Sequence, residues 1–386
     1  MKRMAEQAFF ALLRYDVAGA ELPEAVRETI TESLLPALFS LSKKQDLAHL
    51  IGDALEKNGL LQESSEAHKR FSKERDISLY RQKQQEYALE KICELLEGEK
   101  IPFTPLKGSV IRDYYPERWM RTGCDVDILV SKDDIPRAVE ALKIRLSYNE
   151  GARGDHDVSL VSPSGVHLEL HFSLAASDKR WQELLENPET AARDGGQYRR
   201  AMTPEMLLFY HIVHMAVHMR TGGCGVKPFV DLWVMSEKIS CDKGALDRLL
   251  SAGGLSDFAE AARALSVAWM TGGEMSDICA ELADFVLSGG VFGTLENRVT
   301  VAGAKRGGRL SFLLSRAFIG FDEMALKYPS VRKRALLFPL YQVYRWFDLL
   351  INKKSREYTR ATIKRSGAIS GERAQRLEGL FKKLGI

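Results

Sequence analysis

Residues 106–130 read LKGSVIRDYYPERWMRTGCDVDILV, and the prediction of the fold begins from their pattern. A Lys-Gly-Ser turn at its start is followed by Asp125 and Asp127 inside an apolar run. Side chains on a β-strand alternate between the two faces, so these carboxylates share a face. Two unpaired acids on an apolar strand would repel each other and resist burial. A divalent cation, which prefers hard oxygen ligands, turns this repulsion into binding, so the pair predicts a metal site.

A third acid follows in a second short strand. Residues 166–172 read VHLELHF, in which Glu169 lies between two leucines and shares its face with His167 and His171. The chain therefore contains, in order, a Gly-Ser turn, a strand with Asp-x-Asp and a later strand with one acid.

This order resembles the polymerase-β-type nucleotidyltransferase superfamily. More narrowly, Leu106-Lys-Gly108, Arg121-x3-Asp125-x-Asp127 and Leu168-Glu-Leu-His-Phe172 are similar to a bacterial branch of uncharacterised nucleotidyltransferases, the NTP_transf_5 group. The resemblance implies an α+β fold with a small mixed β-sheet core flanked by N-terminal and C-terminal helical regions. It also implies an enzyme that moves a nucleoside monophosphate from an NTP, ATP foremost, to a hydroxyl-type acceptor with release of pyrophosphate.

The resemblance also implies roles for particular residues. Three acids are expected to bind two Mg2+ or Mn2+ ions and to take part in catalysis: Asp125, Asp127 and Glu169. Backbone N–H groups around Gly108 and Ser109 are suited to a triphosphate, because a helix expected over about residues 110–114 begins there. Lys107 and Arg121 are expected to meet the charge on the phosphates.

Lys227 and Asp231 lie four residues apart on an expected helix. They resemble a basic-x3-Asp element that contributes to nucleotide binding in related nucleotidyltransferases. They are equally consistent with an i,i+4 surface ion pair.

Three histidines fall on one face of the helix expected over residues 203–219: His211, His214 and His218. This face is expected to line the cleft between the sheet and the helices, or to be partly core. With His167 and His171 they form the set of possible cleft residues. A zinc site is the alternative, although no His-Glu-x-x-His pattern is present.

The spacing of apolar residues predicts four parts of the chain. These are an N-terminal helical region (1–98), the nucleotidyltransferase core (99–200), a helical domain (201–351) and a basic helical tail (352–386). Within the core, strands are expected over about 101–106, 125–130, 158–161 and 166–172. From Trp181 onward the chain is expected to be helical to its end.

Composition narrows the class of protein. At 386 residues and 45% hydrophobic residues, the chain can form two or three domains. The five cysteines form no C-x-x-C pair, which favours reduced thiols in the cytoplasm. No apolar stretch reaches about 18 residues, so no membrane association is expected.

Residues 352–386 contain ten Lys/Arg and three Glu, a net charge of +7 in a chain whose total is +3. Such a tail is suited to nucleic-acid phosphates or is a solvated helical face. The acceptor therefore stays open between a small molecule, a protein and an RNA. The alternatives to a transferase are a non-catalytic nucleotide- or nucleic-acid-binding module and metal-assisted phosphoester hydrolysis.

Overall fold

The computed structural model describes residues 1–174, 178–186, 188, 190–192, 196–290, 317–321, 324, 328, 330–333, 335–352, 356, 360 and 371–386. Its first part is helical, as the apolar spacing predicts. The helices of this part are α1 (Lys2–Ala18), α2 (Glu24–Arg27), α3 (Leu35–Lys44), α4 (Ala48–Lys57) and α5 (Glu66–Gly98).

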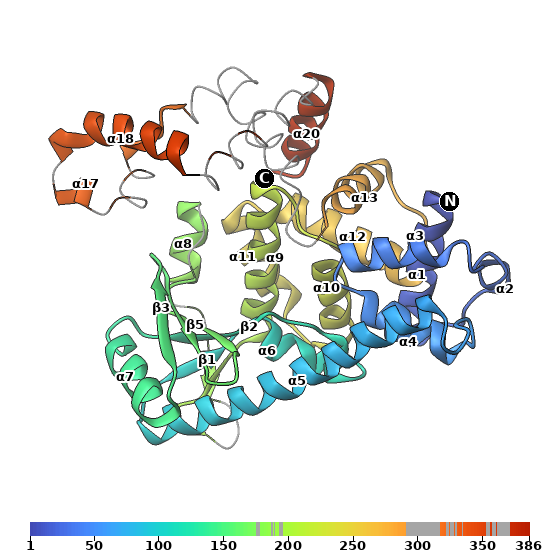
Figure 1. Cartoon of the computed structure of the whole chain (residues 1–386), viewed down its shortest axis with the longest axis horizontal. Coiled ribbons are helices and arrows are strands. Elements are labelled where there is room, and N and C mark those ends of the chain that lie inside the picture. The colour runs from blue at the N-terminus through green and yellow to red at the C-terminus, as the bar shows by residue number, and fades with distance from the viewer. Residues whose placement is uncertain are drawn as a thin grey trace.

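Helix α5 connects the N-terminal helices to the sheet and runs along the lower edge of Figure 1. It begins where Ser65 accepts a hydrogen bond of 3.1 Å from the His68 N–H. Phe71 near its start is buried among the N-terminal helices. Ile92 and Leu96 near its end are buried against the sheet. One 33-residue helix therefore packs into the two larger of the hydrophobic cores found among the described residues.

The central sheet has the strand order β1-β2-β5-β4-β3. Its strands are β1 (Phe103–Pro105), β2 (Asp125–Val130), β3 (Asn149–Arg153), β4 (Asp157–Val161) and β5 (His167–His171). Strands β2 and β5 are parallel and the other neighbours are antiparallel, so the predicted mixed sheet is confirmed. Val126, Ile128 and Val130 join the core formed with α5 and α7 (Ile135–Leu146), which leaves the two acids of β2 on the opposite face.

Two parts of this sheet structure differ from the sequence prediction. The polar, largely exposed residues of β3 form an edge strand and give no alternating apolar signal. The expectation of helix from Trp181 to the chain end is wrong at β6 (Thr190–Ala192) and β7 (Arg200–Met202), which pair with each other. Strands of three residues are too short for a periodic pattern to indicate them.

The later helices include α9, which begins where Thr203 accepts a hydrogen bond from the Met206 N–H and Pro204 occupies the first turn. None of the described helices combines the length and apolar character that a membrane crossing needs. These later helices are α8 (Lys179–Leu185), α9 (Pro204–Thr221), α10 (Lys227–Lys238), α11 (Lys243–Gly253), α12 (Ser256–Thr271), α13 (Asp277–Gly289), α17 (Ser330–Lys333), α18 (Phe338–Ile351) and α20 (Gly371–Lys383).

Helices from both ends of the chain share one core. Phe10 of α1 stacks on Trp269 of α12 with 4.9 Å between ring centroids. Much of the predicted basic tail, including residues 353–355 and 361–370, lies outside the described residues. Its final helix, α20, packs on α13 through an edge-to-face contact between Phe381 and Phe285. Lys383 of α20 also binds Glu281 of α13 at 2.9 Å.

A buried ion pair joins the loop before β2 to α10, and a partly exposed pair joins α10 to the turn between α3 and α4. Arg121 binds both carboxylate oxygens of Asp231 on α10, at 2.9–3.2 Å, and the Tyr115 hydroxyl donates to the same carboxylate at 2.8 Å. Asp231 is only 1% exposed. Lys227 instead binds Asp46, in the turn between α3 and α4, at 2.7 Å. The alternative of a surface ion pair between Lys227 and Asp231 is therefore wrong.

Replacing Asp231 with alanine should lower the free energy of unfolding by about 3–5 kcal/mol, because it leaves the buried charge of Arg121 unpaired. Urea unfolding of the purified variant measures this change. The double variant Arg121→Met/Asp231→Leu should lose less than Asp231→Ala alone, since both charges are then removed. The matched control is Glu94→Ala, which breaks the exposed Lys91–Glu94 pair and should cost less than about 1 kcal/mol.

His49 of α4 fixes the same loop from the other side. Its Nε2 donates to the Met120 carbonyl at 2.8 Å, directly before Arg121. Burial lowers the pKa of His49 from 6.5 to about 4, although the bond to Met120 and the charge of Asp46 favour the protonated ring. The folded chain therefore holds a neutral imidazole where the unfolded chain takes up a proton.

We expect the contribution of His49 to stability to be complete above pH 6.5 and to be lost as the pH falls toward 4. The loss amounts to about 3 kcal/mol, because each pKa unit corresponds to about 1.4 kcal/mol. The variant His49→Gln should lack this part of the pH dependence of the unfolding free energy. Its side-chain amide still offers an N–H donor for the Met120 carbonyl. Unfolding free energies measured from pH 4 to 7 test this, and parallel curves for the two proteins would contradict it.

Candidate active site

The candidate active site is a cavity of about 300 Å³ bounded by β2 and α6 (Gly108–Ile111) on one side and by α9 and α10 on the other. Most of the residues expected from the sequence line it, although they come from distant parts of the chain. The predicted residues that line the cavity are Lys107, Gly108, Arg121, Asp125, Asp127, His211, His214, His218, Lys227 and Asp231.

The parallel pairing of β2 and β5 brings the acids together. Asp127 is directly opposite Glu169, and Asp125 is opposite His167. Asp127, Glu169 and His171 offer ligand atoms that lie within 4.8 Å of one another. The sequence indicated Asp125 as the third ligand, whereas the tightest described cluster contains His171, two residues after Glu169 on the same face of β5.

Two partners inside the sheet balance the negative charge of Asp127. Lys107 Nζ lies 2.7 Å from its Oδ1, and His171 Nε2 donates to the same oxygen at 2.8 Å. Burial alone would raise the pKa of Asp127, but the hydrogen bond from His171 and the charge of Lys107 hold it well below its usual range. Burial opposes the charge of His171, but its bonds to Asp127 and Glu169 raise the pKa of the imidazole. Asp127 is therefore a carboxylate at neutral pH.

The pKa of Asp125 is shifted in the opposite direction to that of Asp127. Burial raises its pKa, and the negative charges of Asp127 and Glu169 raise it further. A bound cation would reduce the electrostatic repulsion among these carboxylates. Carboxylate oxygens are the donors that Mg2+ and Mn2+ prefer. The donor set of Asp125, Asp127 and Glu169 therefore fits a hard divalent ion.

The turn before α6 has an unusual backbone. Lys107 adopts φ 44° and ψ −122°, in a region that non-glycine residues rarely occupy. At Gly108 an added Cβ would lie only 3.0 Å from Arg121 Nη1, so the glycine makes room for the guanidinium. Ser109 is buried and does not line the cavity. Its N–H donates to the Leu106 carbonyl at 3.1 Å, which removes it from the donors open to a triphosphate.

The predicted histidine face of α9 is divided between two environments. His211 is buried, and its Nε2 donates to the Pro228 carbonyl at 2.9 Å. His214 and His218 are half-buried, and their Nε2 atoms lie 3.2 Å apart. Burial lowers the pKa of His214 well below its ordinary value, so the ring is neutral at pH 7.

Three residues near the site were not expected from the sequence. Tyr210 lines the cavity one helical turn before His214, so helical spacing alone could have added it to the set. Tyr115 and Asp46 hold Asp231 and Lys227 in place from separate segments of the chain. No local sequence pattern predicts such contacts, because each partner lies more than a hundred residues away along the chain.

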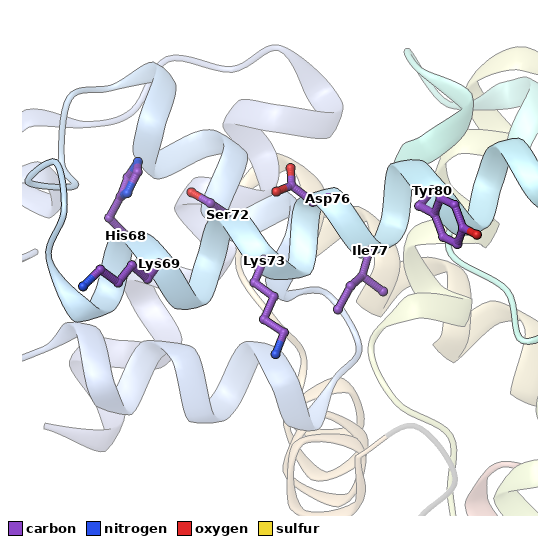
Figure 2. A pocket seen from close by; sticks show the side chains of 7 residues that line it. All are labelled: His68, Lys69, Ser72, Lys73, Asp76, Ile77 and Tyr80. Carbon is purple, nitrogen blue, oxygen red and sulfur yellow. The ribbon is translucent and has the colours of Figure 1, made fainter.

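Two other hollows do not contain the acids. His167 lines one of about 220 Å³ with Arg81, Gln84 and Gln85. Figure 2 shows another, of about 500 Å³, along the exposed side of α5, and all its lining residues belong to that helix, from His68 to Tyr80. The cavity at β2 is therefore the candidate active site.

A family model identifies the class of the chain. A family model described as "Uncharacterised nucleotidyltransferase" matches residues 32–271, well over half of the chain. Among solved structures, the chain is similar to an antigenic nucleotidyltransferase-like protein from Paracoccidioides brasiliensis, with 18% identity and a TM-score of 0.33 over 48% of this chain and 91% of that one. A search of the curated proteins finds no match. From the family match, this chain belongs to the family of uncharacterised nucleotidyltransferases.

Proposed function

We propose that the chain transfers a nucleoside monophosphate from an NTP to a hydroxyl-type acceptor and releases pyrophosphate. The observation that carries the proposal is the register of β2 and β5, which pairs Asp127 with Glu169 two residues from Asp125. Both acids of β2 line the same cavity as three cationic side chains: Lys107, Arg121 and Lys227. Carboxylates for a metal beside cations for phosphates are the parts that nucleotidyl transfer needs.

Asp125, Asp127 and Glu169 would hold a divalent ion, Mg2+ or Mn2+, with His171 beside them. When bound, such an ion neutralises charge on the triphosphate and lowers the pKa of the attacking hydroxyl. Glu169 is half-buried beside Asp127, and it would accept the acceptor's proton. The bond formed joins the acceptor oxygen to the α-phosphorus, and the bond broken releases pyrophosphate.

The nucleotide is assigned to the side of the cavity at α6 and α10. Lys107, Arg121 and Lys227 would meet its phosphates, with Gly108 giving space beside them. Asp231 acts through Arg121, whose guanidinium it holds in one orientation by two hydrogen-bonded oxygens. This arrangement favours a transferase over a binding module, because a module that only holds a nucleotide has no need for three acids on adjacent strands.

Mg2+ or Mn2+ added with ATP should raise the melting temperature of the chain, because ligands that bind only the folded state stabilise it. In Asp125→Ala/Asp127→Ala this shift should vanish, since the ligands of the ion are gone. Differential scanning fluorimetry measures both proteins. The matched control, Asp133→Ala/Glu140→Ala, removes two exposed acids near α7 and should keep the shift. An unchanged shift in the first double variant would sink the metal assignment.

Incubation of the chain with a cell extract and α-labelled ATP should place label in an acceptor, while γ-labelled ATP should yield labelled pyrophosphate. Glu169→Gln should slow the transfer by about a hundredfold or more, because a positioned general base contributes that much. Thin-layer chromatography and gel electrophoresis separate labelled small molecules, RNA and protein. Labelled inorganic phosphate in place of pyrophosphate would indicate hydrolysis instead.

A further inference from the structure

The cavity contains a second group of nitrogen donors that the proposed reaction does not use. His214 and His218 lie one turn apart on α9, and their rings meet edge to face with 4.5 Å between centroids. The two Nε2 atoms lie 3.2 Å apart. We propose that this histidine pair is a chelating site for a divalent transition-metal ion such as Zn2+ or Co2+.

The distance between the two nitrogens fits such an ion. Zn2+ binds imidazole nitrogen at about 2.0–2.1 Å with tetrahedral angles, which places two ligand nitrogens about 3.3 Å apart. Histidines at i and i+4 of a helix present both rings to one point, so the backbone needs no adjustment. A direct N–H···N hydrogen bond has a similar length, and titration with metal ions distinguishes a hydrogen-bonded pair from a chelating pair.

The third histidine of the face is not part of this site. His211 Nε2 donates to the Pro228 carbonyl, so the three histidines together do not form the site expected of a structural zinc. Cys224 also lines the cavity, but it is buried and its Sγ contacts the Met219 Sδ at 3.7 Å. Among the described residues, the proposed chelate therefore has two protein ligands, His214 and His218.

The remaining coordination positions face the cavity. Among the described residues, the one cluster of three potential ligands is Asp127, Glu169 and His171, and the histidine pair stands apart from it. The open positions would take water or an oxygen of a bound molecule. Imidazole favours Zn2+, Cu2+, Ni2+ and Co2+, while the carboxylates of β2 and β5 favour Mg2+ or Mn2+. The histidine pair and the carboxylate cluster would then select different ions.

Titration of the chelator-treated chain with Co2+, followed by visible absorption, and with Zn2+, followed by calorimetry, tests this site. One ion should bind per chain and remain bound in excess Mg2+. His214→Asn and His218→Asn should each weaken binding by about tenfold or more, since loss of even a supporting partner of a metal ligand costs that much. Circular dichroism checks that each variant folds. If one single variant fails to fold, the other, which is on a separate helical turn, still tests the site.

His211→Asn is the matched control, because it changes a histidine of the same helix face whose Nε2 is already used, and it should keep the affinity. Asp125→Ala/Asp127→Ala should also keep it. Equal affinity in the wild type and both ligand variants would overturn the site and leave a plain hydrogen bond. Loss of Co2+ in the aspartate variant alone would assign the ion to the acids. The thermal shift with Mg2+ and ATP is a separate readout, so failure of this inference and failure of the proposed function are distinguishable.

Discussion

The neutralisation of a carboxylate buried in the middle of the sheet is the constraint on which the rest of the structure depends. Asp127 is 3% exposed, and an isolated charge in that position would be costly. Lys107 and His171 both bind its Oδ1, one from the turn after β1 and one from β5. The strained backbone of Lys107 and the parallel pairing of β2 with β5 are therefore parts of one arrangement around this oxygen.

The same principle joins the sheet to the helices. Arg121 leaves the loop before β2 and meets Asp231 on α10, while Lys227 of α10 meets Asp46 between α3 and α4. Breaking the buried Arg121–Asp231 pair costs more than forming it gains, because the partner is left charged and without water, whereas Asp46 of the second pair is partly exposed. The two pairs therefore hold the walls of the cavity in a defined relation, although the walls come from segments more than a hundred residues apart.

The sequence predicted what is encoded locally. The bounds of β2 and the same-face placement of Glu169 and His171 follow from alternating apolar residues, the mixed sheet follows from the family resemblance, and the structure agrees. The polar edge strand β3 and the short β6–β7 hairpin have no such alternation and were missed. The partners of Lys227 and Asp231 were also missed, because spacing along a helix suggests that they bind each other and only the tertiary fold brings Asp46 and Arg121 to them.

Each of the three Lys or Arg side chains that line the described cavity already has a carboxylate partner, and the pairs differ in what a phosphate can change. The Arg121–Asp231 pair is buried and strengthened by Tyr115, so a ligand gains little by separating it. The Lys107–Asp127 pair belongs to the group of acids, and a bound triphosphate would attract Lys107 away from Asp127. Asp127 would then need another positive charge, and its low pKa keeps it ready as an oxygen ligand. A divalent cation satisfies that need, so nucleotide and metal would each bind better in the presence of the other.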